Sequence, residues 1–241
     1  MKQIPLAIGP LVEPTFDNFL AGHNGAACAQ LLSLVEAGPL AASPAAPAPL
    51  YLWGPAGAGK THLLRALSHR LQAAGLAVGW FDAATPQPWH WSPDWHSVVI
   101  DRCDMLNAPA QHAAFALFVE AAAHGTQVAA AGRLPPVDLA LREDLKSRLA
   151  WGHVLALQTL GDAETRAVLR RQADHRGLLL PDEVLDYLLT RFERNLGYLM
   201  RLLDALDAYG LVHGRHITVP LVRALLAEPE LAPQPDETTT A

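Results

Sequence analysis

Gly54-Pro55-Ala56-Gly57-Ala58-Gly59-Lys60-Thr61 is the stretch that decides the fold of this chain. It matches the phosphate-binding pattern G-x-x-x-x-G-K-[ST]. The apolar run 50–53 precedes it, and a helical stretch begins at Lys60. Glycines let successive backbone N–H groups curl around phosphate oxygens, and a following helix points the positive end of its dipole at the same anion. This strand–loop–helix context predicts a binding site for a nucleoside phosphate.

Each polar residue type in the loop has a chemical role in the predicted site. Lys60 is expected to reach the β- and γ-phosphates, and the Thr61 hydroxyl is expected to ligate Mg²⁺. The apolar run 98–100 ends in Asp101, a carboxylate placed to hold the magnesium shell beside Thr61. The predicted ligand is therefore a nucleoside phosphate with Mg²⁺. The residues expected to bind it here are Gly54, Pro55, Gly57, Ala58, Gly59, Lys60, Thr61 and Asp101.

Two aromatic residues lie upstream, in Thr15-Phe16-Asp17-Asn18-Phe19. A glycine turn follows, and then Asn24, which is expected to be the N-cap of the first helix. Phe16 and Phe19 are candidates for the wall of an adenine pocket. The alternative is that both are ordinary core residues.

Composition narrows the class of protein. With 24 acidic and 18 basic residues, the formal net charge is −6, which disfavours direct DNA binding. Only two cysteines are present, too few for a disulfide framework. Prolines interrupt the N-terminus, and no apolar run is long enough to span a bilayer, so neither a signal peptide nor a membrane segment is predicted. A soluble, cytoplasmic protein with no membrane partner is expected.

Strand-like and helical segments alternate through the first two thirds of the chain. Short continuous apolar strands separated by helices indicate an α/β fold whose parallel sheet is covered on both faces. After Leu157 the strand pattern ends, and helical patterns alone continue. The strands are expected at 50–53, 77–81, 97–101, 126–131 and 153–157, and the later helices at 163–176, 182–194, 196–211 and 219–227.

Together these segments resemble the AAA+ core of the DnaA family of replication initiators, and more closely its Hda branch, the regulatory inactivators of DnaA. Residues 15–19, the phosphate-binding loop at 54–61 (the P-loop) and Asp101 match in order and spacing. Arg133-Leu134-Pro135-Pro136 and the segment 144–152 match as well. The resemblance spans residues 1–227. It implies a P-loop NTPase core with a parallel five-stranded sheet, followed by a small all-helical lid. The segment 144–152 looks like the family's Box VII, whose arginine projects into a neighbouring subunit's ATP site, and Arg148 matches that arginine.

The N-terminus also resembles a family feature. Gln3-Ile4-Pro5-Leu6-Ala7-Ile8 looks like the Q-x-x-L-x-[L/I/F] peptide that docks on the β sliding clamp of DNA polymerase III. Gln3 would hydrogen-bond at the pocket rim while Leu6 and Ile8 enter an apolar pocket, and Pro5 pre-extends the peptide. The expected domains are a clamp-binding segment at 1–14, an AAA+ core at 15–158, a helical lid at 159–228 and a flexible tail at 229–241.

The chain departs from the family where hydrolysis is concerned. Arg102 stands where many P-loop ATPases place a second acid, and Gly132-Arg133 stands where the family carries an acid before the Pro-Pro pair. Gly197 aligns with the lid's sensor 2 arginine, for which Arg194 or Arg201 is a candidate substitute. The resemblance still implies binding of ADP or ATP with Mg²⁺, with weak intrinsic ATPase activity.

Two functions follow from the resemblance. In the first, a nucleotide-bound regulator docks on the clamp and supplies Arg148 in trans to ATP held by DnaA, which stimulates hydrolysis and inhibits replication initiation. The chain ends after the expected lid, so no helix-turn-helix domain for sequence-specific DNA binding is expected. A homodimer is left open. The alternative is an autonomous AAA+ ATPase, such as a DnaC-type helicase loader or a clamp-loader subunit.

Overall fold

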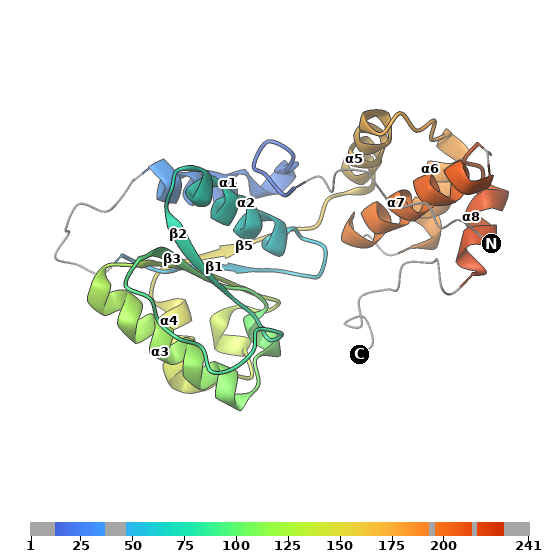
Figure 1. Cartoon of the computed structure of the whole chain (residues 1–241). Coiled ribbons are helices and arrows are strands. Elements are labelled where there is room, and N and C mark those ends of the chain that lie inside the picture. The colour runs from blue at the N-terminus through green and yellow to red at the C-terminus, as the bar shows by residue number, and fades with distance from the viewer. Residues whose placement is uncertain (1–12, 37–46, 193–195, 214–215, 229–241) are drawn as a thin grey trace. The chain divides into compact units, whose positions relative to one another are not determined.

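The computed structural model describes residues 13–36, 47–192, 196–213 and 216–228. Two compact units divide the chain, one built from residues 13–158 and the other from the described residues after Gln158. Figure 1 shows a sheet with helices in the first unit and helices alone in the second. Gln3, Leu6, Ile8, Arg194 and the predicted tail at 229–241 lie outside the described residues.

A five-stranded parallel sheet forms the centre of the first unit, in the order β2-β3-β4-β1-β5. This confirms the predicted sheet. The last four residues of β3 and all of β4 are buried because helices cover both faces of these strands. The strands are β1 (Leu50–Trp53), β2 (Ala77–Phe81), β3 (Trp95–Ile100), β4 (Gln127–Gly132) and β5 (His153–Ala156).

Alternate residues of each strand pack on opposite faces of the sheet. On β1, Leu50 and Leu52 join the cluster formed with α1 and α2, whereas Tyr51 joins the cluster formed with α3 and α4. Figure 1 shows the two helix pairs on opposite sides of the strands. These helices are α1 (Gly25–Glu36), α2 (Lys60–Ala73), α3 (Ala108–His124) and α4 (Glu143–Ala150).

The second unit consists of four helices around a leucine-rich core, as predicted. Leu188, Leu202 and Leu206 are fully buried there, because each lies on the inward face of its helix. Arg166 and Arg170 of the first helix form ion pairs with acids of the second, Asp186 and Asp182. The helices are α5 (Asp162–His175), α6 (Asp182–Arg191), α7 (Leu196–His213) and α8 (Val219–Leu226).

Several helix boundaries differ from the sequence expectation, and the ends of α5 to α8 lie one to three residues from the expected ones. Helix α3 begins at Ala108, because Asn107 caps it by accepting a hydrogen bond from the Ala110 N–H at 3.0 Å. Pro109 is tolerated there because the first turn leaves its N–H groups unpaired. Asn24 is not an N-cap: it ends the short 3₁₀ helix η1 (Gly22–Asn24), and its side chain is buried.

Candidate functional site

The P-loop runs from the end of β1 to the start of α2, as the motif requires. Gly54 and Gly59 have φ angles of 150° and 90°, where residues with a Cβ are strained. Each is also closely packed: a Cβ on Gly54 would lie 2.3 Å from the Leu157 carbonyl oxygen, and one on Gly59 would lie 2.5 Å from the Phe19 ring. Neither glycine position therefore has room for a side chain. The loop leads directly into the N-terminus of α2, where free N–H groups favour an anion.

Lys60 folds its side chain back over this loop. Its Nζ donates hydrogen bonds to the carbonyl oxygens of Gly54 at 2.7 Å and Pro55 at 2.8 Å. Burial lowers the pKa of Lys60, while the charges of Asp104 and Asp101 act in the opposite direction. A phosphate group arriving at the loop would meet an ammonium that the loop itself already positions.

Thr61 and Asp101 meet at the base of the loop, as the sequence predicted. The Thr61 hydroxyl donates to Asp101 Oδ2 at 2.7 Å. The second carboxylate oxygen, Oδ1, is buried and has no hydrogen-bond partner among the described residues. Burial of the carboxylate raises the pKa of Asp101. A buried oxygen without a partner fits a magnesium ion with its water shell, for which Thr61 and Asp101 supply the oxygen ligands.

The described residues contain no group of three or more His, Cys, Asp or Glu side chains that could hold a metal ion. The Thr61–Asp101 pair fits instead a magnesium ion that arrives with a nucleotide and keeps most of its water.

Of the two predicted aromatic residues, Phe19 lies against the P-loop. Phe19 packs beside Gly59, and its ring centroid lies 5.3 Å from that of His62 on α2. Phe16 is partly buried and packs on the same cluster as α1 and α2. The short turn that carries them is held by reciprocal bonds between Thr15 and Asn18.

Histidines on α2 are residues that sequence reasoning missed. His62 Nε2 bonds the Thr15 carbonyl oxygen at 2.9 Å, and His69 Nδ1 bonds that of Pro14 at 3.1 Å. Since a carbonyl only accepts, each of these ring nitrogens must be the donor. Burial lowers the pKa of His62, which favours the neutral ring. The helix that follows the P-loop thus fixes the segment bearing Phe16 and Phe19.

Asn24 has a different role from the capping role expected for it. Its side-chain amide donates to the Gln158 carbonyl oxygen at 2.9 Å, and its Oδ1 accepts from the Gln158 N–H at 2.8 Å. This pairing ties the start of the first helix to the chain just after β5. The 134-residue separation between the partners explains why a local sequence pattern could not reveal it.

Two arginines, Arg102 and Arg133, follow the ends of the central strands, where the family resemblance led us to expect acids. Arg102 follows β3 with a φ of 50°, and its guanidinium bonds Asp82 at 3.0 Å. Arg133 follows β4 and forms an ion pair with Asp104 at 2.8 Å. In the lid, Gly197, which aligns with the sensor 2 arginine, and Arg201, a candidate substitute for it, lie on α7 and are exposed.

Arg148 lies in the last turn of α4. Its guanidinium carbon is 6.0 Å from the centroid of the Phe115 ring, in a cation–π arrangement. No acidic residue in the described part of the chain forms an ion pair with it. By contrast, Arg142 pairs with Asp144 and Lys146 with Glu143. The structure therefore distinguishes Arg148 from the basic residues beside it.

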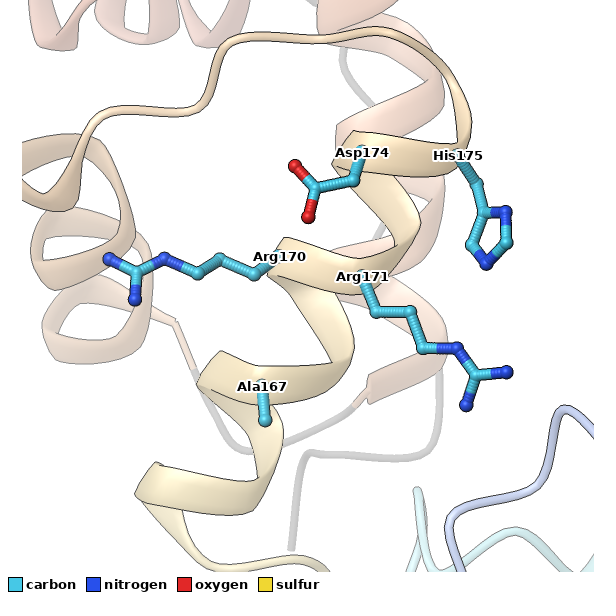
Figure 2. A pocket seen from close by; sticks show the side chains of 5 residues that line it. All are labelled: Ala167, Arg170, Arg171, Asp174 and His175. Atoms are coloured by element: carbon cyan, nitrogen blue, oxygen red, sulfur yellow. The ribbon is translucent and has the colours of Figure 1, made fainter.

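A shallow surface hollow lies on α5 in the second unit, and its lining includes two arginines and a histidine. Figure 2 shows Arg170 and Arg171 pointing away from each other, so the cations do not converge on one point. Arg170 is also paired with Asp182. This hollow does not make a candidate binding site.

Among the described residues, no helix combines the length and the apolar character needed to cross a membrane.

Comparison with known sequences assigns both units. The family model of the Hda lid domain matches residues 162–226, and that of the bacterial DnaA ATPase domain matches residues 12–78. An uncharacterized protein of Haemophilus influenzae is 30% identical over 237 residues, which cover 93% of this chain and 98% of that protein. The similarity therefore extends along almost the whole of both chains.

Solved structures show the same architecture. Domain III of the Thermotoga maritima replication initiation protein DnaA is 21% identical, with a TM-score of 0.72 over 90% of this chain and 96% of that chain. AMPPCP-bound DnaA from Aquifex aeolicus is 20% identical, with a TM-score of 0.63 over 83% and 68%. The RuvB Holliday junction branch migration motor of Thermotoga maritima is 18% identical, with a TM-score of 0.62 over 88% and 70%.

These likenesses confirm the predicted AAA+ fold, a parallel five-stranded core followed by a helical lid. With a lid that matches Hda, a core segment that matches DnaA and a relative aligned over nearly its full length, the chain belongs to the Hda/DnaA-like family of AAA+ proteins.

Proposed function

We propose that the chain binds ADP or ATP with Mg²⁺ at the loop between β1 and α2. The loop backbone and Lys60 would hold the phosphates, and Thr61 and Asp101 would hold the metal's water shell. Phe16 and Phe19 would lie beside the adenine. Support comes from the Asp101 oxygen that has no hydrogen-bond partner among the described residues, and from the shared fold of DnaA with AMPPCP bound.

We further propose that the nucleotide-bound chain is a negative regulator of replication initiation. Gln3, Leu6 and Ile8 would dock it on the β sliding clamp of DNA polymerase III, as a short peptide with apolar anchors. Arg148 would then reach ATP held by DnaA and stabilise the charge that develops on the transferring phosphoryl group. Hydrolysis would occur in the partner's site, so this chain would act as an activator of DnaA's ATPase.

The single observation that carries this proposal is the environment of Arg148. Its neighbours Arg142 and Lys146 are neutralised by acids, whereas Arg148 has no acidic partner among the described residues and lies against the face of Phe115. An arginine that serves a partner must keep its donors available, and its planar fork suits a phosphate better than an ammonium would. Trp151, just past the end of α4, is 59% exposed and extends this surface with an apolar side chain.

The proposal assigns one role to each part of the chain. Residues 1–14 would bind the clamp, 15–158 would bind nucleotide, and 159–228 would form the lid, with a tail at 229–241. The family membership supports DnaA as the partner. A homodimer remains compatible with this assignment, because Arg148 would then serve a second copy.

The test is hydrolysis of ATP preloaded on DnaA, in the presence of this chain and clamp loaded on DNA, with each component omitted in turn. We expect turnover to require all of them. Replacing both Gln3 and Leu6 with Ala should remove the dependence on clamp, whereas Leu11→Ala, in the same segment but outside the pattern, should not. Equal turnover without clamp would contradict the docking role. Hydrolysis by this chain in the absence of DnaA would favour the autonomous ATPase.

A further inference from the structure

An ion pair spans the ends of two neighbouring strands beside the P-loop. Asp104 belongs to the 3₁₀ helix η2 (Cys103–Met105) after β3, and Arg133 follows directly after β4. Asp104 Oδ1 accepts from the Arg133 backbone N–H at 3.1 Å, and Oδ2 accepts from Arg133 Nε at 2.8 Å. Both carboxylate oxygens are therefore engaged by the same residue.

The strand register places this pair next to the phosphate-binding loop. Trp53, the last residue of β1, is the partner of Gly132, the last residue of β4. The next residue along β1 is Gly54, where the P-loop begins, and the next along β4 is Arg133. The charges of Asp104 and Arg133 both influence the pKa of Lys60, in opposite directions. The pair therefore lies at the phosphate end of the site.

The surrounding packing holds the pair in place. Tyr51, fully buried on β1, donates from its hydroxyl to the Leu134 carbonyl oxygen at 2.9 Å. A Cβ on Gly132 would lie 2.2 Å from that hydroxyl and 3.4 Å from Asp104 Oδ1. The backbone that carries Arg133 thus has little room to move away from Asp104. The Asp104 side chain is only 13% exposed.

The carboxylates of Asp101 and Asp104, both near Lys60, have different hydrogen-bond partners. Asp101 accepts from Thr61 and suits the metal shell, whereas Asp104 has no place in that pairing. A carboxylate near the phosphates is the kind of group that accepts a proton from attacking water. Arg133 donates a hydrogen bond to each Asp104 oxygen, so an attacking water would have to compete with Arg133 for this carboxylate.

We propose that the Arg133–Asp104 ion pair is a latch that suppresses a latent ATPase activity of this chain. The inference rests on the proposed binding of ATP at the P-loop. When the latch is released, the oxygen of a water molecule bonds the γ-phosphorus, and the water proton passes to an Asp104 oxygen. The bond from the γ-phosphorus to the β–γ bridging oxygen breaks, giving ADP and inorganic phosphate. With the latch closed, ATP is held without turnover.

The test is single-turnover hydrolysis of bound ATP, with Mg²⁺ and without DnaA or clamp. Arg133→Asn removes the guanidinium, and we expect the rate to rise by about 10²-fold, the lower range for a positioned general base. Asp104→Asn and the double variant should both stay at the wild-type rate, because the proton acceptor is missing. Arg142→Asn is the matched control, since it breaks an equally close Arg–Asp pair away from the P-loop and should leave the rate unchanged.

Calorimetric titration with ADP and with a non-hydrolysable ATP analogue separates the remaining outcomes. A wild-type rate for Arg133→Asn with both ligands still bound would overturn the latch. Loss of the ATP analogue alone would also overturn it, because Arg133 would then be a phosphate ligand. If the wild-type chain bound neither ligand, the proposed function itself would fail. Should Arg133→Asn not fold by circular dichroism, Arg133→Gln keeps the aliphatic stem and answers the same question.

Discussion

Charged side chains have different partners at the phosphate-binding end of the sheet and at the edge formed by α4 and β5. At the phosphate-binding end, ionic and polar side chains are held by other groups of the chain: Lys60 by Gly54 and Pro55, Asp101 by Thr61, Asp104 by Arg133 and Asp82 by Arg102. At the edge, Arg148 meets an aromatic face, and the apolar side chains of Trp151 and Val154 are exposed.

This difference separates a site that the chain organises for itself from a surface that it presents. Groups fixed within the chain are already arranged before a small ligand arrives, which reduces the entropy lost on binding. An arginine with no acidic partner in the described part of the chain and a large exposed tryptophan instead suit recognition by another macromolecule. The comparison predicts that substitutions at the two places will affect different measurements.

Replacing Arg148 with Ala should produce the largest effect. We expect stimulation of DnaA-bound ATP hydrolysis to fall by about 10³–10⁵-fold, the range of arginine fingers. Arg148→Lys should restore little, because an ammonium lacks the planar fork. The measurement is turnover of ATP on DnaA with clamp loaded on DNA, and nucleotide affinity of the variant should be unchanged.

Lys146→Ala is the control for Arg148. Lys146 lies two residues away on the same helix but pairs with Glu143 at 2.7 Å. We expect it to retain most of the stimulation. If Lys146→Ala and Arg148→Ala lost activity equally, the effect would reflect the charge of the edge and not a single arginine. Near-normal turnover with Arg148→Ala would contradict the role in trans.

Lys60→Ala tests the phosphate-binding end of the sheet and should have an intermediate effect. Hydrogen bonds to a charged group contribute about 1.5–3 kcal/mol, so we expect ADP affinity to fall by about 10- to 100-fold. Calorimetric titration in Mg²⁺ measures it. Arg70→Ala, an exposed cation in the last turn of the same helix, should bind ADP like the wild type. Unchanged affinity of the Lys60 variant would show that the loop does not bind phosphate.

The strands and the central site residues could be predicted from sequence because their patterns are local. The run Leu50–Trp53 and the P-loop that follows it lie within one short segment, and the predicted strand bounds match β1 and β2 exactly as the structure has them. Asp101 was recognisable as the acid that ends an apolar strand, and it does contact Thr61. Each of these features needs only a few neighbouring residues.

Contacts between distant segments could not be predicted in the same way. His62 with Thr15, Tyr51 with Leu134 and Asn24 with Gln158 join residues 47, 83 and 134 positions apart. Histidine, tyrosine and asparagine occur in many surroundings, so nothing in the local sequence marks them. The pairing of Asp104 with Arg133 likewise could not be predicted, because it depends on β3 and β4 lying side by side in the sheet.

Gly132→Ala should give the smallest effect and sharpen the account of the phosphate-binding end. The new methyl group would lie 2.2 Å from the buried Tyr51 hydroxyl, so the side chain or the strand must shift. Such overpacking costs about 1–3 kcal/mol, which chemical denaturation measures as a lower midpoint at unchanged slope.

Gly25→Ala is the matched control for Gly132. Gly25 begins α1, and a Cβ there would meet nothing within 4 Å. Because alanine restricts the unfolded chain more than glycine does, we expect it to be neutral or stabilising by about 0.4–1 kcal/mol. Equal midpoints for the two variants would mean that the ends of β1 and β4 are not tightly packed. The fixed position of Arg133 beside Asp104, on which the latch depends, would then lose its structural basis.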